Sequence, residues 1–177
     1  MREPFHSLRE PLGLVRHLNL EVGAPHSTLE IVQIKDRVLQ FFEYRHDWRE
    51  IWTDGRNLPT LKDVDPGWNG YSVGKWEGNT FVVETMGLDD RSWLDNLGYP
   101  HSEEAQLEER YRRVDADTLE LTETVTDPAM YTKPLVSDRK LYKLNRAKAT
   151  KWRPQIYCVP SEEFTLYEKI RYGGLNK

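Results

Sequence analysis

Two runs of sequence joined by a short acidic turn decide the fold class: residues 107–114, LEERYRRV, and residues 118–126, TLELTETVT. Each run alternates apolar with polar residues, and this period of two is typical of a β-strand with one buried face. Residues 115–117, DAD, have the length and polarity of a hairpin loop. The stretch therefore predicts two antiparallel strands that pair with each other.

The register of this hairpin places two glutamates opposite each other on its apolar face. With a three-residue loop, Glu109 faces Glu123, and directly opposed Cβ atoms lie about 5 Å apart. Burial and like charge both raise a carboxyl pKa, so such a pair can share a proton and supply one acid and one base. Two alternatives remain open: neutralisation by Arg49 or Arg113, or a change of register by one residue that separates the carboxylates.

The same alternation recurs along most of the chain. Because about eight or nine strands joined mostly by hairpins exceed one comfortable open sheet, we predict an all-β antiparallel barrel, ahead of a two-sheet sandwich. The chain is expected to form one domain, with an N-terminal extension and first strand at 1–28, the barrel at 29–160 and a tail at 161–177. The other expected elements are strands at 29–34, 38–44, 48–52, 71–76, 80–85, 135–144 and 151–159, long loops at 57–69 and 87–105, and a short C-terminal helix reaching about residue 170.

Composition excludes several classes of function. The 25 Lys and Arg and the 29 Asp and Glu are interleaved along 177 residues, so a nucleic-acid partner is not expected. The apolar clusters are too short for a membrane span. A single cysteine, Cys158, and scattered histidines predict no metal site. Since the sequence has no glycine-rich phosphate loop, we also expect no cofactor.

The N-terminal residues 1–6, MREPFH, lack the basic start and apolar run of a secretion signal. As written, the sequence predicts a cytoplasmic protein, or an exported one if such a signal has been removed. A homodimer is left open.

The irregular segment 87–105 contributes a further candidate, His101, because long ordered loops often carry function and an imidazole transfers protons near neutral pH. The predicted catalytic residues are thus Glu109, His101 and Glu123. Arg49 and Arg56 are candidate ligand anchors, although an ion pair with Asp54 explains Arg56 equally well. The aromatic residues expected to line a cavity, or else to form the core, are Trp76, Phe81, Trp93, Tyr111 and Tyr131.

Several ordered blocks of the chain resemble a broad family of bacterial proteins of unassigned function, common in acidobacteria and proteobacteria. The resemblance covers roughly residues 29–160 and implies a lipocalin-like, calycin-type β-barrel that is frequently exported. It implies no particular activity. The blocks are REIWTDGR at 49–56, WNGYSVGKWEGNTFVV at 68–83, WLD at 93–95, PHSE at 100–103, ERYRR at 109–113, DP at 127–128 and YTKP at 131–134.

Two departures from that family pattern affect the interpretation. Family members usually carry a signal peptide and a Cys-Leu-Pro-like segment near the start, whereas this chain has PLGLVR at 11–16. His101, Glu109 and Arg110 lie in matching blocks without an obvious folding reason, but Glu123 is not part of the pattern. The facing carboxylates are therefore not expected as chemistry shared by the family, and a specialisation of this chain is left open.

Two functional hypotheses follow, with a purely structural or interaction module as a third. The first is a cofactor-independent isomerase, cyclase or lyase that transfers protons on a small hydrophobic molecule, aromatic or polyketide-like, inside the barrel. The second is a carrier that binds such a molecule without chemistry, as lipocalin-type barrels commonly do. The first two hypotheses differ in the fate of the bound molecule: a carrier releases it unchanged, whereas an enzyme converts it.

Overall fold

All regular structure in the described part of the chain is β-strand. A computed structural model describes residues 15–20, 28–42, 47–95 and 98–145, and no helix occurs among them. The predicted all-β class is confirmed; the expected strand at 151–159 and the C-terminal helix lie outside the described residues. The strands are β1 (Val15–Leu20), β2 (Thr28–Gln33), β3 (Arg37–Phe42), β4 (Trp48–Trp52), β5 (Tyr71–Glu77), β6 (Thr80–Met86), β7 (Gln106–Arg113), β8 (Thr118–Thr126), β9 (Leu135–Val136) and β10 (Lys140–Asn145).

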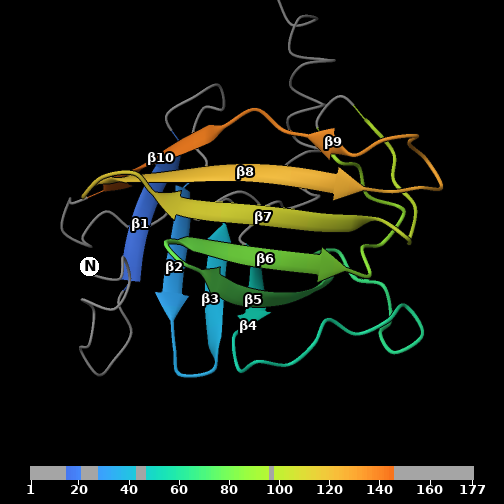
Figure 1. Ribbon diagram of the computed structural model, residues 1–177, viewed down its shortest axis with the longest axis horizontal. Helices are drawn as coiled ribbons and strands as arrows, with labels where there is room; N and C mark the ends of the chain where they lie inside the picture. The colour runs from blue at the N-terminus through green and yellow to red at the C-terminus, as the bar shows by residue number, and fades with distance from the viewer. Residues whose placement is uncertain (1–14, 21–27, 43–46, 96–97, 146–177) are drawn as a thin grey trace, which may run out of the picture.

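The strands form one strongly curled, mostly antiparallel sheet with the shape of a half-barrel. Each strand from β1 to β8 pairs with the next in sequence, and β10 pairs with both β1 and β8. In Figure 1, β5 to β8 run across the view while β1 to β4 cross their direction, so the sheet bends back on itself. The predicted strand at 135–144 is interrupted, since β9 and β10 pair with different parts of β8.

One pair of neighbouring strands departs from the predicted antiparallel pattern. β4 and β5 run parallel, with Ile51 opposite Ser72 and Trp52 opposite Val73. The long loop between them carries the chain back to the end at which β4 begins. Its residue Asn69 donates hydrogen bonds to the Asp47 side chain and to the backbone carbonyl of Trp48. Because β5 starts beside the start of β4, the two strands must run in the same direction.

The predicted hairpins are present with the expected turns. β5 and β6 pair as far as Glu77 opposite Thr80, and Gly78 in the turn has a φ of 59°, where an L side chain would be strained. At the turn between β7 and β8, the Asp115 carboxylate accepts hydrogen bonds from the backbone N–H of Asp117 and the Thr118 hydroxyl. An aspartate in that position commonly closes a loop in this way.

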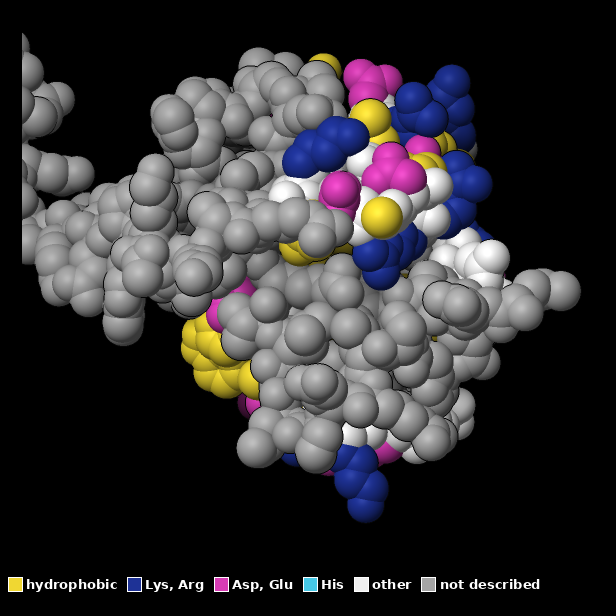
Figure 2. All heavy atoms as spheres, turned by 90° about the vertical axis from the view of Figure 1, so that its left-hand side faces the viewer, with side chains coloured by type: hydrophobic (Ala, Val, Ile, Leu, Met, Phe, Trp, Pro, Cys, Tyr) yellow, Lys and Arg dark blue, Asp and Glu magenta, His cyan; other side chains and the backbone are white. Residues whose placement is uncertain are grey.

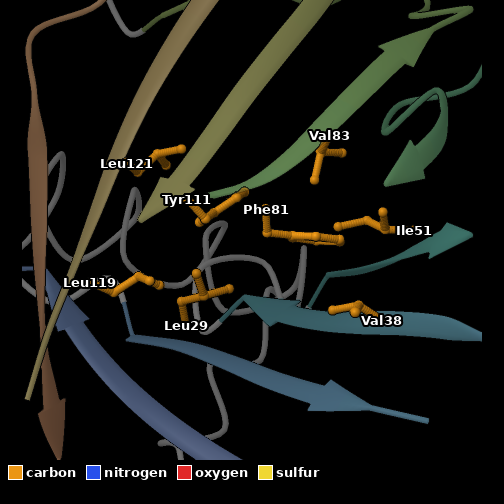
Figure 3. Close-up of a cluster of buried hydrophobic side chains, with 8 residues drawn as sticks. All are labelled: Leu29, Val38, Ile51, Phe81, Val83, Tyr111, Leu119 and Leu121. Atoms are coloured by element: carbon orange, nitrogen blue, oxygen red, sulfur yellow. The ribbon is translucent and has the colours of Figure 1, made fainter. Parts of the chain in front are cut away.

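The apolar core lies on the concave face of the sheet. Its buried side chains come from six strands and point toward one another in Figure 3: Leu29, Val38, Ile51, Phe81, Val83, Tyr111, Leu119 and Leu121.

Gly74 lets the ring of Phe81 lie flat across β5. A Cβ built on Gly74 would lie 2.4 Å from Phe81 Cζ and 2.9 Å from Ile51 Cγ2, so no larger residue fits there without movement. The lack of a side chain at Gly74 therefore allows Phe81 to pack closely against β5.

Charged side chains of both signs share the outer surface. Figure 2 shows described Lys and Arg side chains next to Asp and Glu on the face that it presents. Arg112 of β7 and Arg139, the residue before β10, both pair with Glu120 of β8. No helix among the described residues is long and apolar enough to cross a membrane.

Candidate functional site

Four polar side chains form a closed hydrogen-bonded circuit within the apolar interior. Arg49 Nε donates to Gln40 Oε1 at 2.7 Å, and Gln40 Nε2 donates to the Tyr111 hydroxyl at 3.1 Å. The Tyr111 hydroxyl donates to Glu109 Oε1 at 2.8 Å. Arg49 Nη2 closes the circuit, 2.7 Å from each carboxylate oxygen of Glu109. We call these four residues the interior circuit.

The interior circuit joins strands that are not neighbours in the sheet. Gln40 and Arg49 face each other across β3 and β4, while Glu109 and Tyr111 lie on β7. In a flat sheet, β4 and β7 would be three strand spacings apart, about 14 Å. The 2.7 Å contact of Arg49 with Glu109 therefore depends on the curl, which brings the two walls within reach of one arginine side chain.

All members of the interior circuit are shielded from solvent. The exposed fractions are 1% for Gln40, 9% for Arg49, and 3% each for Glu109 and Tyr111. Burial is the largest single influence on Arg49 and would lower its pKa, but the charge and hydrogen bonds of Glu109 and the contacts with Tyr111 together outweigh it, so the pKa is raised. Burial, reinforced by the Glu109 charge, holds the pKa of Tyr111 well above its ordinary value. Arg49 therefore stays cationic and Tyr111 stays a neutral phenol across the physiological range.

A second polar group lies beside the interior circuit. Glu123 on β8 forms an ion pair with Lys140 of β10. Tyr142, two residues farther along β10, packs against the core. Burial and the charges of Glu123 and Glu109 raise the pKa of Tyr142 to about 12, so its hydroxyl keeps its proton.

The structure confirms the predicted register of the two glutamates and shows how their charges are compensated. Glu109 lies directly opposite Glu123 in the β7–β8 ladder. Each carboxylate, however, has its own cation, Arg49 for Glu109 and Lys140 for Glu123. The structure therefore supports one of the alternatives left open by the sequence, in which Arg49 neutralises Glu109. Arg113 instead bonds the backbone of its own turn.

His101 occupies a different cluster, in the loop between β6 and β7. Its ring is 4% exposed, with Nε2 at 2.7 Å from Ser92 Oγ and Nδ1 at 3.0 Å from the Ser102 carbonyl. Ser102 is held by buried Asp127, whose carboxylate accepts from its backbone N–H at 2.7 Å and its hydroxyl at 2.8 Å. Among the described residues, no hydrogen bond joins His101 to Glu109.

The remaining predicted ligand residues divide between core and surface. Phe81 belongs to the core, and Trp76, 40% exposed, lies against it with ring centroids 5.0 Å apart. Trp93 is 70% exposed. The Tyr131 hydroxyl donates to the Pro100 carbonyl at 2.7 Å and so fastens the loop that carries His101.

Arg56 forms the ion pair that the sequence offered as the alternative to ligand binding. Its Nη2 lies 2.6 Å from Asp54 Oδ2, its Nη1 donates to the Tyr71 hydroxyl at 2.8 Å, and its guanidinium lies 3.6 Å from the Trp52 ring centroid. These contacts fix the loop after β4.

Sequence reasoning missed four residues of these clusters: Gln40, Ser92, Lys140 and Tyr142. Gln40 had a usable signal, because a polar residue lies between the inward-facing Val38 and Phe42 of one strand. Ser92 lies in a loop whose sequence has no periodic pattern. The start of the strand that contains Lys140 and Tyr142 is determined by its pairing with β8, and no turn signal in the sequence marks it.

No group of three or more His, Cys, Asp or Glu side chains suited to a metal ion occurs in the part of the chain that the structure describes. Comparison of the chain with protein-family models, curated proteins and solved structures found no match. The resemblance to the bacterial family therefore remains a prediction, and the chemistry of the site has to be argued from its geometry.

Proposed function

We propose that this protein is a lipocalin-like barrel that binds a small, mainly apolar molecule on the concave face of its sheet. In this proposal β10, which pairs with β8 on one side and β1 on the other, closes the curled sheet into a barrel. The interior circuit forms the polar end of the binding site. The apolar side chains of the core cluster form its walls.

The observation that carries this proposal is the hydrogen bonding of Arg49. Its Nε and Nη2 bond within the interior circuit, whereas Nη1 donates to none of the described residues. Two N–H groups on a side chain that is 91% shielded need an acceptor, because an unsatisfied buried donor costs about 1–3 kcal/mol. A ligand carbonyl or carboxylate is a suitable acceptor, and a guanidinium binds such groups with directional hydrogen bonds.

The rest of the interior circuit supports Arg49 as an anchor. The Tyr111 hydroxyl already donates to Glu109 and accepts from Gln40 and from Arg49 Nη2, so its bonding capacity is filled. These contacts hold the guanidinium in one orientation before a ligand arrives. Preorganisation of this kind reduces the entropy lost on binding.

The second candidate function is cofactor-independent proton transfer at the same place, of the isomerase, cyclase or lyase type. The hydrogen bond from the Tyr111 phenol to Glu109 favours it, since a phenol bonded to a carboxylate can relay a proton. Glu109 would be the acid or base, with Glu123 and Tyr142 nearby. The ion pair with Arg49 favours binding over catalysis, because both carboxylate oxygens of Glu109 already accept hydrogen bonds from Arg49 Nη2.

Native mass spectrometry of the freshly purified full chain separates these functions. A binding protein is expected to carry a small molecule that is recovered unchanged after incubation with fresh protein. Conversion of that molecule would favour proton transfer. A chain that carries nothing, and that takes up no mainly apolar carboxylic acid such as palmitate from solution, would contradict both.

A further inference from the structure

The loop between β6 and β7 holds a serine and a histidine in the arrangement of a nucleophile and its base. Ser92 Oγ lies 2.7 Å from His101 Nε2, a normal hydrogen-bond distance for proton transfer. We propose that Ser92 is a nucleophile activated by His101 and that it accepts the acyl group of small carboxylic esters. This site lies in the loop and does not depend on the binding proposed for the sheet interior.

The hydrogen bond on the other ring nitrogen fixes the tautomer of His101. The carbonyl oxygen of Ser102 can only accept, so His101 Nδ1 carries the proton of that 3.0 Å hydrogen bond. In the neutral imidazole, Nε2 then presents its lone pair to the Ser92 hydroxyl. This is the tautomer that a general base requires.

The Ser92 hydroxyl has one proton and two acceptors within reach. Besides His101 Nε2, the Asp89 carbonyl lies 2.9 Å from Oγ. With neutral His101 the proton points to Nε2; with the imidazolium, Nε2–H donates to Oγ and the hydroxyl turns to Asp89. The serine oxygen therefore keeps a hydrogen-bond partner before and after its proton has moved, which the acylation step needs.

The base is fixed and buried, while the residue that carries the nucleophile is more exposed. His101 is 4% exposed, and Ser92 is half-buried. The Ser102 peptide that orients the ring is itself held by two hydrogen bonds to Asp127, a side chain at 2% exposure. Asp127 is thus a positioning residue that acts through Ser102.

Exposed aromatic residues flank the pair and suit an aryl or alkyl ester. Trp93, the residue after Ser92, is 70% exposed, and Tyr99, two residues before His101, is 51% exposed. The Leu94 N–H donates to the Tyr99 carbonyl at 2.8 Å, so the two ends of this loop are held together. Large aromatic side chains at a surface offer apolar contact to a ligand.

The reaction balances without a cofactor. The Ser92 proton passes to His101 Nε2 as Oγ bonds to the ester carbonyl carbon, and the alcohol leaves with that proton when the ester C–O bond breaks. Water then attacks the acyl-serine, giving one proton to His101 and releasing the carboxylic acid as Ser92 regains its hydrogen. The co-reactants are the ester and water.

A fluorophosphonate probe followed by peptide mapping tests the proposal on the full chain. Label is expected at Ser92 and should fall by about 100-fold or more in the His101→Gln variant. Ser137 is the internal control, since it is also half-buried but, among the described residues, its hydroxyl bonds only backbone groups. Absence of label on folded protein, equal label at Ser92 and Ser137, or unchanged labelling of the His101→Gln variant would overturn the proposal.

A second variant keeps the test decisive if His101→Gln fails to fold. A thiol at position 92 should lose its proton to His101 and react with iodoacetamide at least 10-fold faster than a thiol at position 137. The comparison is Ser92→Cys against Ser137→Cys, with native Cys158 as the reference peptide in both. Equal alkylation rates at the two positions would overturn the proposal.

Discussion

Arg49 on β4 and Glu109 on β7 form an ion pair across the interior of the sheet, although β5 and β6 separate their strands. Arg49 Nη2 lies 2.7 Å from both carboxylate oxygens, and both side chains are more than 90% shielded. An ion pair in an apolar interior contributes little net stability compared with a well-packed apolar pair. Its role in this account is the one proposed above, to anchor a ligand.

Removing one partner of this ion pair should be costly, and removing both should cost less than the sum. Arg49→Met or Glu109→Gln leaves a buried charge without its counter-charge, so each variant should lose about 3–5 kcal/mol of the free energy of unfolding. The double variant should recover part of that loss, because no charge remains uncompensated. Urea unfolding of the native chain, the two single variants and the double variant gives a double-mutant cycle. Additive losses in the free energy of unfolding would show that the two residues are not coupled.

Tyr111→Phe tests the hydroxyl that completes the interior circuit. Its loss leaves Glu109 without one donor and Gln40 without an acceptor, so the free energy of unfolding should fall by about 1–3 kcal/mol. Tyr131→Phe is the matched control, since that hydroxyl bonds only the Pro100 carbonyl among the described residues. Its loss should be the smaller one, and equal urea midpoints for the two variants would contradict the argument.

Gly74→Ala tests the packing of Phe81 against β5. The added methyl group would sit 2.4 Å from Phe81 Cζ, and overpacking of this kind destabilises by about 1–3 kcal/mol. Gly67→Ala is the control, because a Cβ there meets nothing within 4 Å. Thermal unfolding should show a lower midpoint for Gly74→Ala alone, and equal midpoints would mean that the core has room at this point.

The loop that carries Ser92 should lose stability in acid through Asp89. Hydrogen bonds from Arg91 lower the pKa of Asp89 from 3.8 to about 2, although burial opposes the shift. Because the folded pKa is depressed, the ionised carboxylate stabilises the fold fully above pH 3.8, and this contribution disappears as the pH falls toward 2. The difference in urea midpoint between the native chain and Asp89→Asn should therefore shrink between pH 5 and pH 3. Arg91→Ala should weaken that pH dependence, and an undiminished dependence would contradict the assignment.

The hairpin of β7 and β8 could be predicted residue by residue because its signals are local. Alternation identifies the strands, and the short acidic loop sets the register that places Glu109 opposite Glu123. The parallel pairing of β4 with β5 could not be predicted in the same way. It depends on where a long irregular loop returns, and that loop is held by contacts such as the hydrogen bond from Asn69 to Asp47.

The partners of the site residues were the least predictable part. The sequence offered both Arg49 and Arg113 as candidates to neutralise the two glutamates, and no local signal distinguishes between them. Only the curl of the sheet selects Arg49, and curl is a property of many strands together. Likewise, the side-chain chemistry of His101 made it a candidate from the sequence. Its contact with Ser92 lies in a segment whose sequence has no periodic pattern, so that contact could not be predicted.

Titration with anilinonaphthalene sulfonate, an apolar fluorescent anion, tests the proposed binding site most directly. Arg49→Lys keeps the positive charge but removes the guanidinium donors, and Arg113→Lys makes the same change where the arginine bonds the backbone of its own turn. We predict micromolar binding to the native chain and to Arg113→Lys, and affinity at least 10-fold weaker for a folded Arg49→Lys variant. Equal affinity in all three proteins, or no binding to the native chain, would contradict the account.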